Sequence, residues 1–275
     1  MYPFNLRKIV EAALNEDLVF HDPVASSLEK SRVECAMLAK GDLVFCGKDI
    51  VMQVFHTLDG DITLEFYYED GDVVASGSRL GVVKGFSGGI LRGERVALNF
   101  TQRLSGIATI TRKFVEKIEG TGVKICDTRK TTPLLRYLEK YAVRCGGGVN
   151  HRFSLSDGVL IKDNAIKVFG SINEAVSRVK EKTHHLLKIQ VEVENLDELR
   201  EALKSGVDAV LLDNMSREEV TKAVSLAKGK VILEVSGNIT LENVRAYAET
   251  GVDIISSGAL THSAPSVDIS LEVCK

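Results

Sequence analysis

Four short apolar runs in the second half of the chain decide the fold: LLKIQVEV (186–193), AVLLD (209–213), VILEV (231–235) and DIIS (253–256). Their centres recur every 22 residues, and two earlier runs are centred at Ile125 and Leu160. Runs that are almost wholly apolar are typical of parallel strands buried on both faces, and the amphipathic stretches between them complete a βα repeat. The sequence therefore predicts an α/β barrel, which is incomplete because only about six strands can be counted.

Capping signals support the helices of this repeat. Three of them begin with a polar cap followed three residues later by Glu: Ser171 with Glu174, Asn195 with Glu198, and Ser216 with Glu219. Such pairs satisfy the unpaired N–H groups of a first helical turn. Glycines at 206, 229 and 251 then close helices beginning near 195, 216 and 241.

The first third of the chain follows a different pattern. A helical period over Asn5–Glu16 precedes short β-rich runs from about Val33 to Val83, with a turn dipeptide at Asp70-Gly71. We interpret Gly85–Gly93 as a turn, because it lacks the lysine ending of a phosphate loop. A long helix over about Glu94–Glu119 follows. We expect an N-terminal α+β sandwich domain (1–104) and a barrel domain (105–275) whose last residues return to the first domain.

Composition excludes several classes of protein. The 275 residues are 44% apolar and 27% charged, with a net charge of −3, so nothing global favours nucleic acid or an anionic membrane. Five scattered cysteines form no metal-binding spacing and are typical of reduced thiols. The N-terminus lacks the apolar core of a signal peptide, and no run is long enough for a membrane span. These features predict a cytoplasmic protein.

Charged residues collect where the predicted strands end. The active site of such a barrel lies at the carboxyl ends of its strands. Those ends carry Asp127, Arg129, Lys130, Lys162, Glu192, Asp213, Ser236-Gly237 and Ser257-Gly258. Five basic side chains also lie at element boundaries within Asp127–Asn164, namely Arg129, Lys130, His151, Arg152 and Lys162. This concentration predicts an anion site at one mouth of the barrel.

The residue types indicate a ligand class. Arg and Lys suit carboxylates and phosphates, while Glu192 and Asp213 suit ribose hydroxyls or water-bound Mg²⁺. Backbone N–H groups after late strands are a usual phosphate site in barrels. Together they indicate a phosphosugar and a small polycarboxylate. Other charges have simpler readings: Arg136, Lys140 and Arg144 are a solvated helix face, and Glu234 is either catalytic or a buried carboxylate paired with a nearby lysine.

Several segments closely resemble the quinolinate phosphoribosyltransferase family, in order and over essentially the whole chain. They are GERVALN (93–99), SGIAT (105–109), DTRKTTP (127–133), EKYAVRCGGGVNHR (139–152), LIKDN (160–164), VEVEN (191–195), VLLDN (210–214) and ISSGALTHSAP (255–265). The sequence departs from the family pattern at Ala165, where the family has His, at Asn238, where it has Gly, and in the N-terminal stretch after Glu16-Asp17.

The resemblance implies a fold, a reaction and residue roles. It implies an N-terminal α/β sandwich, an open α/β barrel, and a dimer or larger assembly in which one subunit's sandwich caps the other's barrel. The reaction is phosphoribosyl transfer from phosphoribosyl pyrophosphate to quinolinate with decarboxylation, in NAD biosynthesis. Quinolinate would be bound by Arg95 (from the neighbouring subunit), Arg129, His151, Arg152 and Lys162. Lys130, Glu192 and Asp213 would be catalytic, with Mg²⁺ at Glu192 and Asp213. The phosphate would contact Ser236, Gly237, Asn238, Ser257 and Gly258.

Three alternatives stay open at this point. The same fold occurs in a relative associated with molybdate transport, although retention of the charged residues above argues against loss of activity. An aldolase with Lys162 as a Schiff-base lysine requires an unprotonated amine. Nicotinate as the acceptor would leave a buried base unpaired. Spacing alone places Arg95 on a solvated helix face, and only the family resemblance assigns it to a partner's site.

Overall fold

The computed structural model describes residues 6–18, 22–28 and 31–274, which form two compact units. Unit 1 comprises Met1–Arg112, Thr132–Gly147 and Ala264–Lys275, and unit 2 comprises Lys113–Thr131 and Gly148–Ser263. Both units are therefore discontinuous in the sequence. The predicted start of the first helix at Asn5 lies outside the described residues.

Unit 2 is built on a six-stranded sheet in which every described pairing is parallel. Its order is β6 (Lys124–Cys126), β11 (Ile254–Ser256), β10 (Ile232–Ser236), β9 (Ala209–Asp213), β8 (Ile189–Val193) and β7 (Val159–Ile161). The six strands coincide with the six apolar runs, which confirms the predicted open α/β barrel. Because β6 and β7 are the two edges of the sheet, the barrel opens between them.

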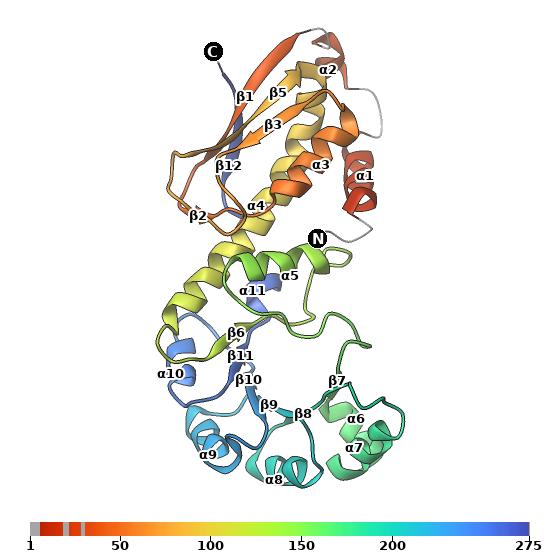
Figure 1. The fold of residues 1–275 in the computed structure, drawn as a ribbon, viewed down its shortest axis with the longest axis vertical. Helices are drawn as coiled ribbons and strands as arrows, with labels where there is room; N and C mark the ends of the chain where they lie inside the picture. Colours follow the sequence, from red (N-terminus) through yellow and green to blue (C-terminus); the bar gives the residue numbers. More distant parts are fainter. Residues whose placement is uncertain (1–5, 19–21, 29–30, 275) are drawn as a thin grey trace. The chain divides into compact units, whose positions relative to one another are not determined.

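Helices line the convex side of this curled sheet (Figure 1). They are α6 (Asp163–Phe169), α7 (Ile172–Lys180), α8 (Leu196–Lys204), α9 (Arg217–Ala227) and α10 (Val244–Ala248), and the short α11 (Ala259–His262) follows β11. The predicted caps are confirmed: Ser171, Asn195 and Ser216 each accept from backbone N–H groups of the first turn, and Ser216 with Glu219 forms a full capping box. The concave side is left for the site.

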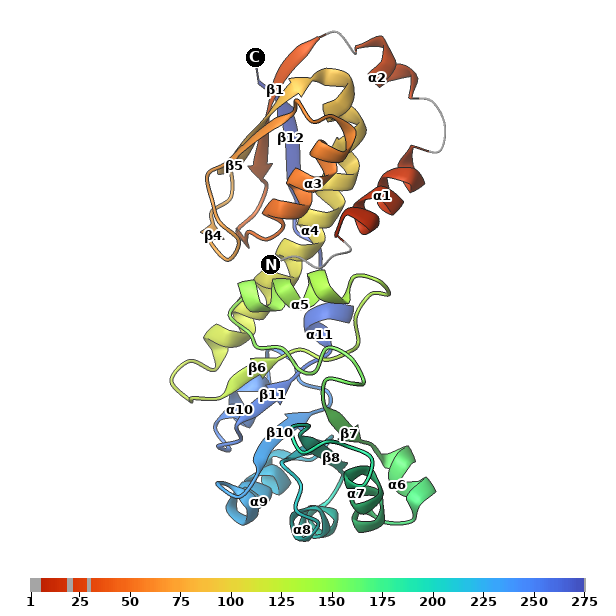
Figure 2. The same ribbon diagram turned by 45° about the vertical axis from the view of Figure 1, so that its right-hand side comes forward.

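Unit 1 contains an antiparallel sheet in the order β12 (Ile269–Val273), β1 (Arg32–Ala39), β5 (Arg79–Phe86) and β3 (Thr63–Phe66). A short pair, β2 (Leu43–Val44) and β4 (Val73–Val74), lies beside it. The last strand of the chain thus pairs with the first. Helices α3 (Lys48–Leu58) and α4 (Ser87–Lys117) cover one face, and α1 (Leu6–Asp17) lies against α3 (Figure 2). The short α2 (Pro23–Ser27) is capped by Asp22. This is the predicted α+β sandwich.

The prediction of a turn at Gly85–Gly93 is wrong. This segment ends β5 and forms the first turns of α4, so the helix starts seven residues before the predicted Glu94. Close contact with α3 and the following loop explains the glycines. A Cβ on Gly93 would lie 2.9 Å from Phe55, and one on Gly89 would lie 3.1 Å from Ile62. The glycines therefore serve helix contact, which outweighs their poor helix propensity.

Helix α5 (Arg136–Cys145) belongs to unit 1, although unit 2 segments flank it in the sequence. Its Lys140 is only 2% exposed, so the prediction of a solvated face fails at that residue. Glu139 is fully buried and forms an ion pair with Arg103 at 2.9 Å. Among the described residues, no helix has both the length and the apolar character needed to cross a membrane.

Candidate active site

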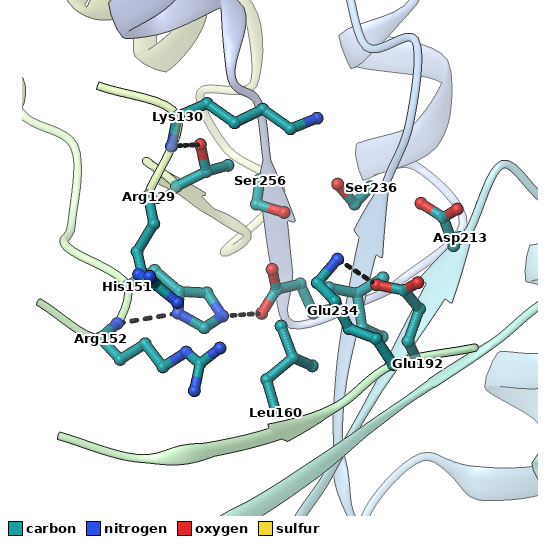
Figure 3. Close-up of a pocket in the computed structure, with 13 residues that line it drawn as sticks. Arg129, Lys130, His151, Arg152, Leu160, Glu192, Asp213, Glu234, Ser236 and Ser256 are labelled. Carbon is teal, nitrogen blue, oxygen red and sulfur yellow. Dashed lines mark hydrogen bonds and ion pairs between the residues drawn. The ribbon is translucent and has the colours of Figure 1, made fainter. Parts of the chain in front are cut away.

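A cavity of about 230 Å³ opens at the carboxyl ends of the unit 2 strands. Its polar and charged lining residues are Thr128, Arg129, Lys130, His151, Arg152, Lys162, Glu192, Asp213, Glu234, Ser236 and Ser256, and Leu160 and Leu211 complete it. Figure 3 shows Arg129, His151 and Arg152 on one side and Glu192 and Asp213 on the other. We call Arg129, Lys130 and Arg152 the cationic wall, and Glu192 and Asp213 the acidic wall.

A buried carboxylate fixes the loops that carry the cationic wall. Asp127, directly after β6, is fully buried and accepts hydrogen bonds from Asn150 Nδ2 at 2.6 Å and from the His151 backbone N–H at 2.9 Å. Val149 forms an isolated parallel β-bridge with Cys126, which also ties the two segments together. Asp127 is thus a structural residue that holds the Asn150–Arg152 segment beside the Arg129–Lys130 segment.

The two arginines of the cationic wall affect one another. Burial lowers the pKa of the Arg152 guanidinium, and the positive charge of Arg129 lowers it further. Arg152 also donates from one terminal nitrogen to the Gly158 carbonyl at 2.8 Å, which fixes its position. Two guanidinium groups close enough to repel each other form a site that an anionic ligand stabilises.

Two hydrogen bonds fix the backbone of Lys130. Its N–H donates to Thr128 Oγ1 at 3.0 Å, and its carbonyl accepts from Thr261 Oγ1 at 2.7 Å. The aliphatic part of its side chain lies over Gly258, where a Cβ would come within 3.0 Å of Lys130 Cδ. Gly258 therefore leaves room for the lysine side chain, which runs into the cavity (Figure 3).

His151 is held at both ring nitrogens. Nδ1 accepts from the Arg152 backbone N–H at 2.8 Å, and Nε2 lies 3.0 Å from Gln190 Oε1. The hydrogen bond from Arg152 occupies the lone pair of Nδ1, so the ring presents Nε2 to Gln190. His151 thus lines the cavity as an organised hydrogen-bonding group.

Glu234 ends this hydrogen-bond chain in the core. It is 3% exposed and accepts from Gln190 Nε2 at 2.8 Å, with His151 Nε2 at 3.5 Å. Burial raises the pKa of this carboxyl, but interactions with His151, Ser256 and Gln190 outweigh burial and lower it overall. The lysine partner considered from the sequence is wrong; the partners are an amide and an imidazole.

The acidic wall is tied to the lysine at the end of β7. Lys162 Nζ forms an ion pair with Glu192 Oε2 at 2.8 Å. The Lys162 side chain is 57% exposed, whereas Glu192 is buried. The pair therefore links the ends of the neighbouring strands β7 and β8 and places a cation and a carboxylate side by side in the cavity.

Asp213 is oriented by two asparagines with left-handed backbone conformations. Asn214 (φ 52°) donates to Asp213 Oδ2 at 2.7 Å and accepts from Asn238 Nδ2 at 3.0 Å. Between them Gly237 has φ 96°, and a Cβ there would lie 2.2 Å from Asn214 Oδ1. Only glycine fits this contact without rearrangement. Asn214 was missed in the sequence analysis, and its position directly after a strand-end aspartate was the available signal.

The cavity brings together seven of the sequence-predicted residues from loops and strand ends that are separate in the sequence. They are Arg129, Lys130, His151, Arg152, Lys162, Glu192 and Asp213, and Ser236 of the phosphate set joins them. Gly237, Asn238, Ser257 and Gly258 lie in the loops just beyond, outside the lining set. Gln190, Glu234 and Ser256 complete the site; Gln190 and Ser256 were not singled out from the sequence. The ligand contacts of all these residues remain predictions.

Arg95 lies on α4 in unit 1 and lines a different cavity, of about 290 Å³. Its neighbours there include Asp17, Asn99 and Arg103. The predicted reach of Arg95 into a partner's site remains a prediction.

The acidic wall fits a magnesium ion that is held mainly by substrate. Mg²⁺ is usually bound through one or two carboxylates plus phosphate oxygens and water. Glu192 Oε2 is engaged by Lys162 and Asp213 Oδ2 by Asn214, which leaves the second oxygen of each carboxylate for an ion or its water shell. Two carboxylates at one mouth match that donor set.

An open α/β barrel with basic, acidic and small residues at its mouth defines a class of enzyme that acts on anionic, phosphate-bearing substrates. Comparison with known proteins gives the family. A profile of the quinolinate phosphoribosyl transferase C-terminal domain matches residues 107–272, and that of the N-terminal domain matches residues 17–105. The chain belongs to the quinolinate phosphoribosyltransferase family, whose members are pentosyltransferases.

Individual relatives agree over nearly their whole length. A probable nicotinate-nucleotide pyrophosphorylase [carboxylating] of Bacillus subtilis is 42% identical, over 99% of this chain and 95% of the relative. A quinolinate phosphoribosyltransferase [decarboxylating] of Nicotiana tabacum is 36% identical, over 98% of this chain and 82% of the relative. The solved nicotinate-nucleotide pyrophosphorylase of Francisella tularensis has a TM-score of 0.95 at 41% identity, covering 100% of this chain and 98% of that one.

Proposed function

We propose that the unit 2 cavity transfers the phosphoribosyl group of phosphoribosyl pyrophosphate to quinolinate and decarboxylates the product, giving nicotinate mononucleotide, pyrophosphate and CO₂ for NAD biosynthesis. Family membership over the whole chain and the names of its relatives support this reaction. One observation assigns this reaction to particular side chains. The neighbouring guanidinium groups of Arg129 and Arg152 line the same cavity as Glu192 and Asp213.

The cationic wall suits the two carboxylates of quinolinate. Each guanidinium offers a planar fork that matches a carboxylate, and the dianion relieves the repulsion between Arg129 and Arg152. Lys162 supplies a further positive charge beside Glu192. His151 contributes by ordering the Arg152 backbone through Nδ1. We therefore propose that Arg129, Arg152 and Lys162 bind quinolinate and that His151 positions this set.

The acidic wall suits the ribose side of the reaction. The pyridine nitrogen attacks the anomeric carbon, the bond from that carbon to pyrophosphate breaks, and pyrophosphate leaves with the electron pair. Positive charge develops on the ribose as that bond breaks, and Glu192 and Asp213 stabilise it. Lys130, reaching from the other side, stabilises the negative charge that develops on pyrophosphate. We propose that Ser236 and the Gly237-Asn238 and Ser257-Gly258 loops receive the 5′-phosphate.

Decarboxylation then needs no nucleophile from the protein. The 2-carboxylate leaves as CO₂, the electron pair of the broken carbon–carbon bond enters the positively charged ring, and the carbon takes a proton. Positioning of the substrate by the cationic wall and electrostatic stabilisation account for the rate.

We propose Mg²⁺ as the metal, held by Glu192 and Asp213 directly or through water. When bound, the ion would neutralise charge on the pyrophosphate leaving group. The free second oxygens of the two carboxylates support this assignment.

The aldolase alternative is weaker in light of the structure. A Schiff-base lysine must present a neutral amine, whereas Lys162 forms an ion pair with Glu192 at 2.8 Å and is largely exposed. Nicotinate as acceptor is also disfavoured, because a monocarboxylate would leave one of the neighbouring arginines without its ligand.

The test is an assay with quinolinate labelled in the 2-carboxylate, phosphoribosyl pyrophosphate and Mg²⁺. We expect labelled CO₂ and nicotinate mononucleotide in equal amounts. The absence of product from a folded protein that binds both substrates would overturn the proposal. Trapping with borohydride in the presence of carbonyl substrates provides the contrast, because a covalent adduct at Lys162 would favour the aldolase.

We also propose a cytoplasmic homodimer in which Arg95 is donated to the partner's cavity. The separate location of Arg95 in unit 1 and the family resemblance support this. Mixing the inactive variants Arg95→Ala and Arg129→Ala should restore activity, because a mixed dimer then holds one intact site. If the mixture stays inactive although subunits exchange, both arginines act within one chain and the proposal fails.

A further inference from the structure

Two cysteines that are distant in the sequence meet inside unit 1. Cys46 follows β2, and Cys145 is the last residue of α5. Their sulfur atoms and a carboxylate oxygen of Asp70 lie within 4.8 Å of one another. The two thiols lie close enough for each to shift the pKa of the other. A disulfide requires sulfurs about 2.05 Å apart, so the two sulfur atoms must move closer together to form one.

The Cys46 side of the pair is fixed by its backbone. Its N–H donates to Ser105 Oγ at 2.9 Å, and its carbonyl accepts from Thr101 Oγ1 at 3.1 Å. Cys46 itself is 0% exposed. Its backbone is therefore held in place and its thiol is shielded from solvent, so the partner that reaches it must come from within the fold.

The Cys145 side is held by the Asp70-Gly71 turn. Asp70 Oδ2 accepts from Tyr141 Oη at 2.8 Å on α5, and Asp70 Oδ1 accepts from the N–H groups of Gly47 and Lys48 at 2.9 and 3.1 Å. A Cβ on Gly71 would lie 3.3 Å from the Cys145 carbonyl oxygen, so the turn lies directly against the end of α5. This one carboxylate thus joins the two chain segments that carry the cysteines.

These contacts favour thiol chemistry over metal binding. Asp70 already accepts three hydrogen bonds, which occupy most of its acceptor capacity, so the group offers two thiols and a carboxylate that is largely satisfied. A structural zinc site takes four ligands, usually Cys or His. A pair of adjacent thiols alone suits a disulfide.

The two thiols differ in a way that assigns their roles. Cys145 is partly exposed, and its hydrogen bond with Cys46 lowers the pKa of its thiol, against burial and the charge of Asp70. The same bond raises the pKa of the Cys46 thiol, and burial raises it further. The thiolate is the nucleophilic form, so Cys145 reacts first and Cys46 second.

We propose that Cys46 and Cys145 form a peroxide-oxidised dithiol site that closes to an intramolecular disulfide. The Cys145 thiolate attacks a hydroperoxide oxygen, the O–O bond breaks, and hydroxide leaves, giving a sulfenic acid. The Cys46 sulfur then attacks the sulfenic sulfur; the S–S bond forms, the S–O bond breaks, and the departing hydroxide takes the Cys46 proton to give water. The thiols lose two electrons and the peroxide gains them.

The disulfide would cross-link the inserted segment Thr132–Gly147 to the rest of unit 1. It joins the Met1–Arg112 part of unit 1 to Thr132–Gly147, whose two ends continue into the loops that carry Arg129–Lys130 and His151–Arg152. Cross-links that close long loops restrict the unfolded chain most. The oxidised protein should therefore unfold at a higher urea concentration than the reduced one. The inference does not depend on the proposed function.

The test treats the reduced, full-length protein with hydrogen peroxide and maps its thiols by mass spectrometry without reductant. We expect one cross-linked peptide pair, containing Cys46 and Cys145, that has lost two hydrogens and separates again with dithiothreitol. In Cys46→Ala, the Cys145 sulfenic acid should persist and be captured by dimedone. Cys35→Ala is the matched control and should cross-link like the wild type, because burial raises the pKa of the Cys35 thiol to about 11.

Three results would overturn the inference. Both thiols could remain titratable after peroxide has consumed the other partly exposed thiol, Cys274, or Cys145 could pair with a different cysteine. The purified protein could also hold one zinc ion that protects both thiols from alkylation until a chelator removes it, in which case the cluster is a metal site. The wild-type map alone decides among these results, so the test does not depend on the variants folding.

Discussion

The two walls of the cavity are built in opposite ways. Glu192 and Asp213 of the acidic wall lie on five-residue strands inside the sheet, where Glu192 is paired with Leu211 of β9 and Asp213 with Ser236 of β10. The cationic wall lies in loops beyond β6 and before β7, the two short edge strands, and depends on Asp127 and on the His151 hydrogen bonds for its position. The barrel itself thus provides the ribose side of the site, whereas the acceptor side requires buried polar groups.

This difference predicts how substitutions will act. Changes in the acidic wall should alter the reaction and leave the structure intact. Changes to the groups that hold the cationic wall should alter stability and acceptor binding together. The effects below run from the largest to the smallest.

Arg152→Ala should cause the largest loss. It removes the half-buried guanidinium that faces the acceptor, and losing one partner of a hydrogen-bonded charge pair costs about 2–5 kcal/mol, which corresponds to about 30- to 4,000-fold in kcat/KM for quinolinate. Arg152→Lys should recover part of this loss, because it restores charge but not the bidentate fork. Arg178→Ala removes an exposed ion pair with Glu174 and serves as control. Equal kcat/KM for Arg152→Ala and wild type would remove Arg152 from the site.

Glu192→Gln should come next, with a loss of about 10²-fold in kcat, because it removes charge that stabilises the ribose transition state. Thermal unfolding should change little, since Lys162 is largely exposed and remains hydrated. The matched control is Glu194→Gln, an exposed glutamate two residues further on. If Glu192→Gln raised only KM for quinolinate and left kcat unchanged, the ribose role would be wrong.

Glu234→Gln tests the hydrogen bonds that support the cationic wall. The quantity measured is the free energy of unfolding as a function of pH. Interactions with His151, Ser256 and Gln190 lower the pKa of Glu234 in the folded state, against the effect of burial. Its stabilisation is therefore complete above its unfolded pKa of about 4.3 and is lost as the pH falls through the lower folded value. The variant should be less stable by about 1 kcal/mol at neutral pH.

Urea unfolding of both proteins from pH 7 down to pH 3 measures this. The difference in the free energy of unfolding between wild type and Glu234→Gln should be constant above about pH 5 and shrink at lower pH. A difference that grew on acidification would show that folding raises the pKa of Glu234 instead of lowering it. That result would change the assignment of the hydrogen-bond chain to His151.

Asn214 should give the smallest effect. Asn214→Gly tolerates the left-handed backbone but loses the hydrogen bond to Asp213, so KM for phosphoribosyl pyrophosphate should rise by about 5-fold, equivalent to about 1 kcal/mol. Asn214→Ala should show the same KM and also lose about 1 kcal/mol of stability from backbone strain. Calorimetry and steady-state kinetics separate the two effects. Identical stability of the Gly and Ala variants would mean that the backbone strain is negligible.

The fold could be predicted because its signals are local. The apolar runs, the capping pairs at Ser171, Asn195 and Ser216, and the closing glycines each depend on neighbouring residues. The failures came from tertiary contact. Gly89 and Gly93 are typical of a turn, yet they lie in α4 because α3 and its following loop approach too closely for a side chain. Lys140 is typical of a solvated face, yet it is buried.

The charged residues of the site could be predicted, but not the network that supports them. Residues at strand ends share one mouth by topology, which placed Arg129, Lys162, Glu192 and Asp213 together. Gln190 lies two residues before Glu192, and Glu234 lies two before Ser236, so the period of a strand puts each pair on the same face. That spacing indicates a polar interior. Their hydrogen bonds to His151 depend on a loop from another part of the chain, which no local pattern encodes.

The preference for quinolinate over nicotinate tests the central claim most directly. If the cationic wall is built for two carboxylates, wild-type kcat/KM should favour quinolinate by about 10⁴-fold, because nicotinate lacks the second carboxylate that the two neighbouring guanidinium groups would bind. Arg152→Ala should reduce this preference sharply by slowing quinolinate alone. Comparable rates for the two acceptors in the wild type, or an unchanged preference in Arg152→Ala, would contradict the account.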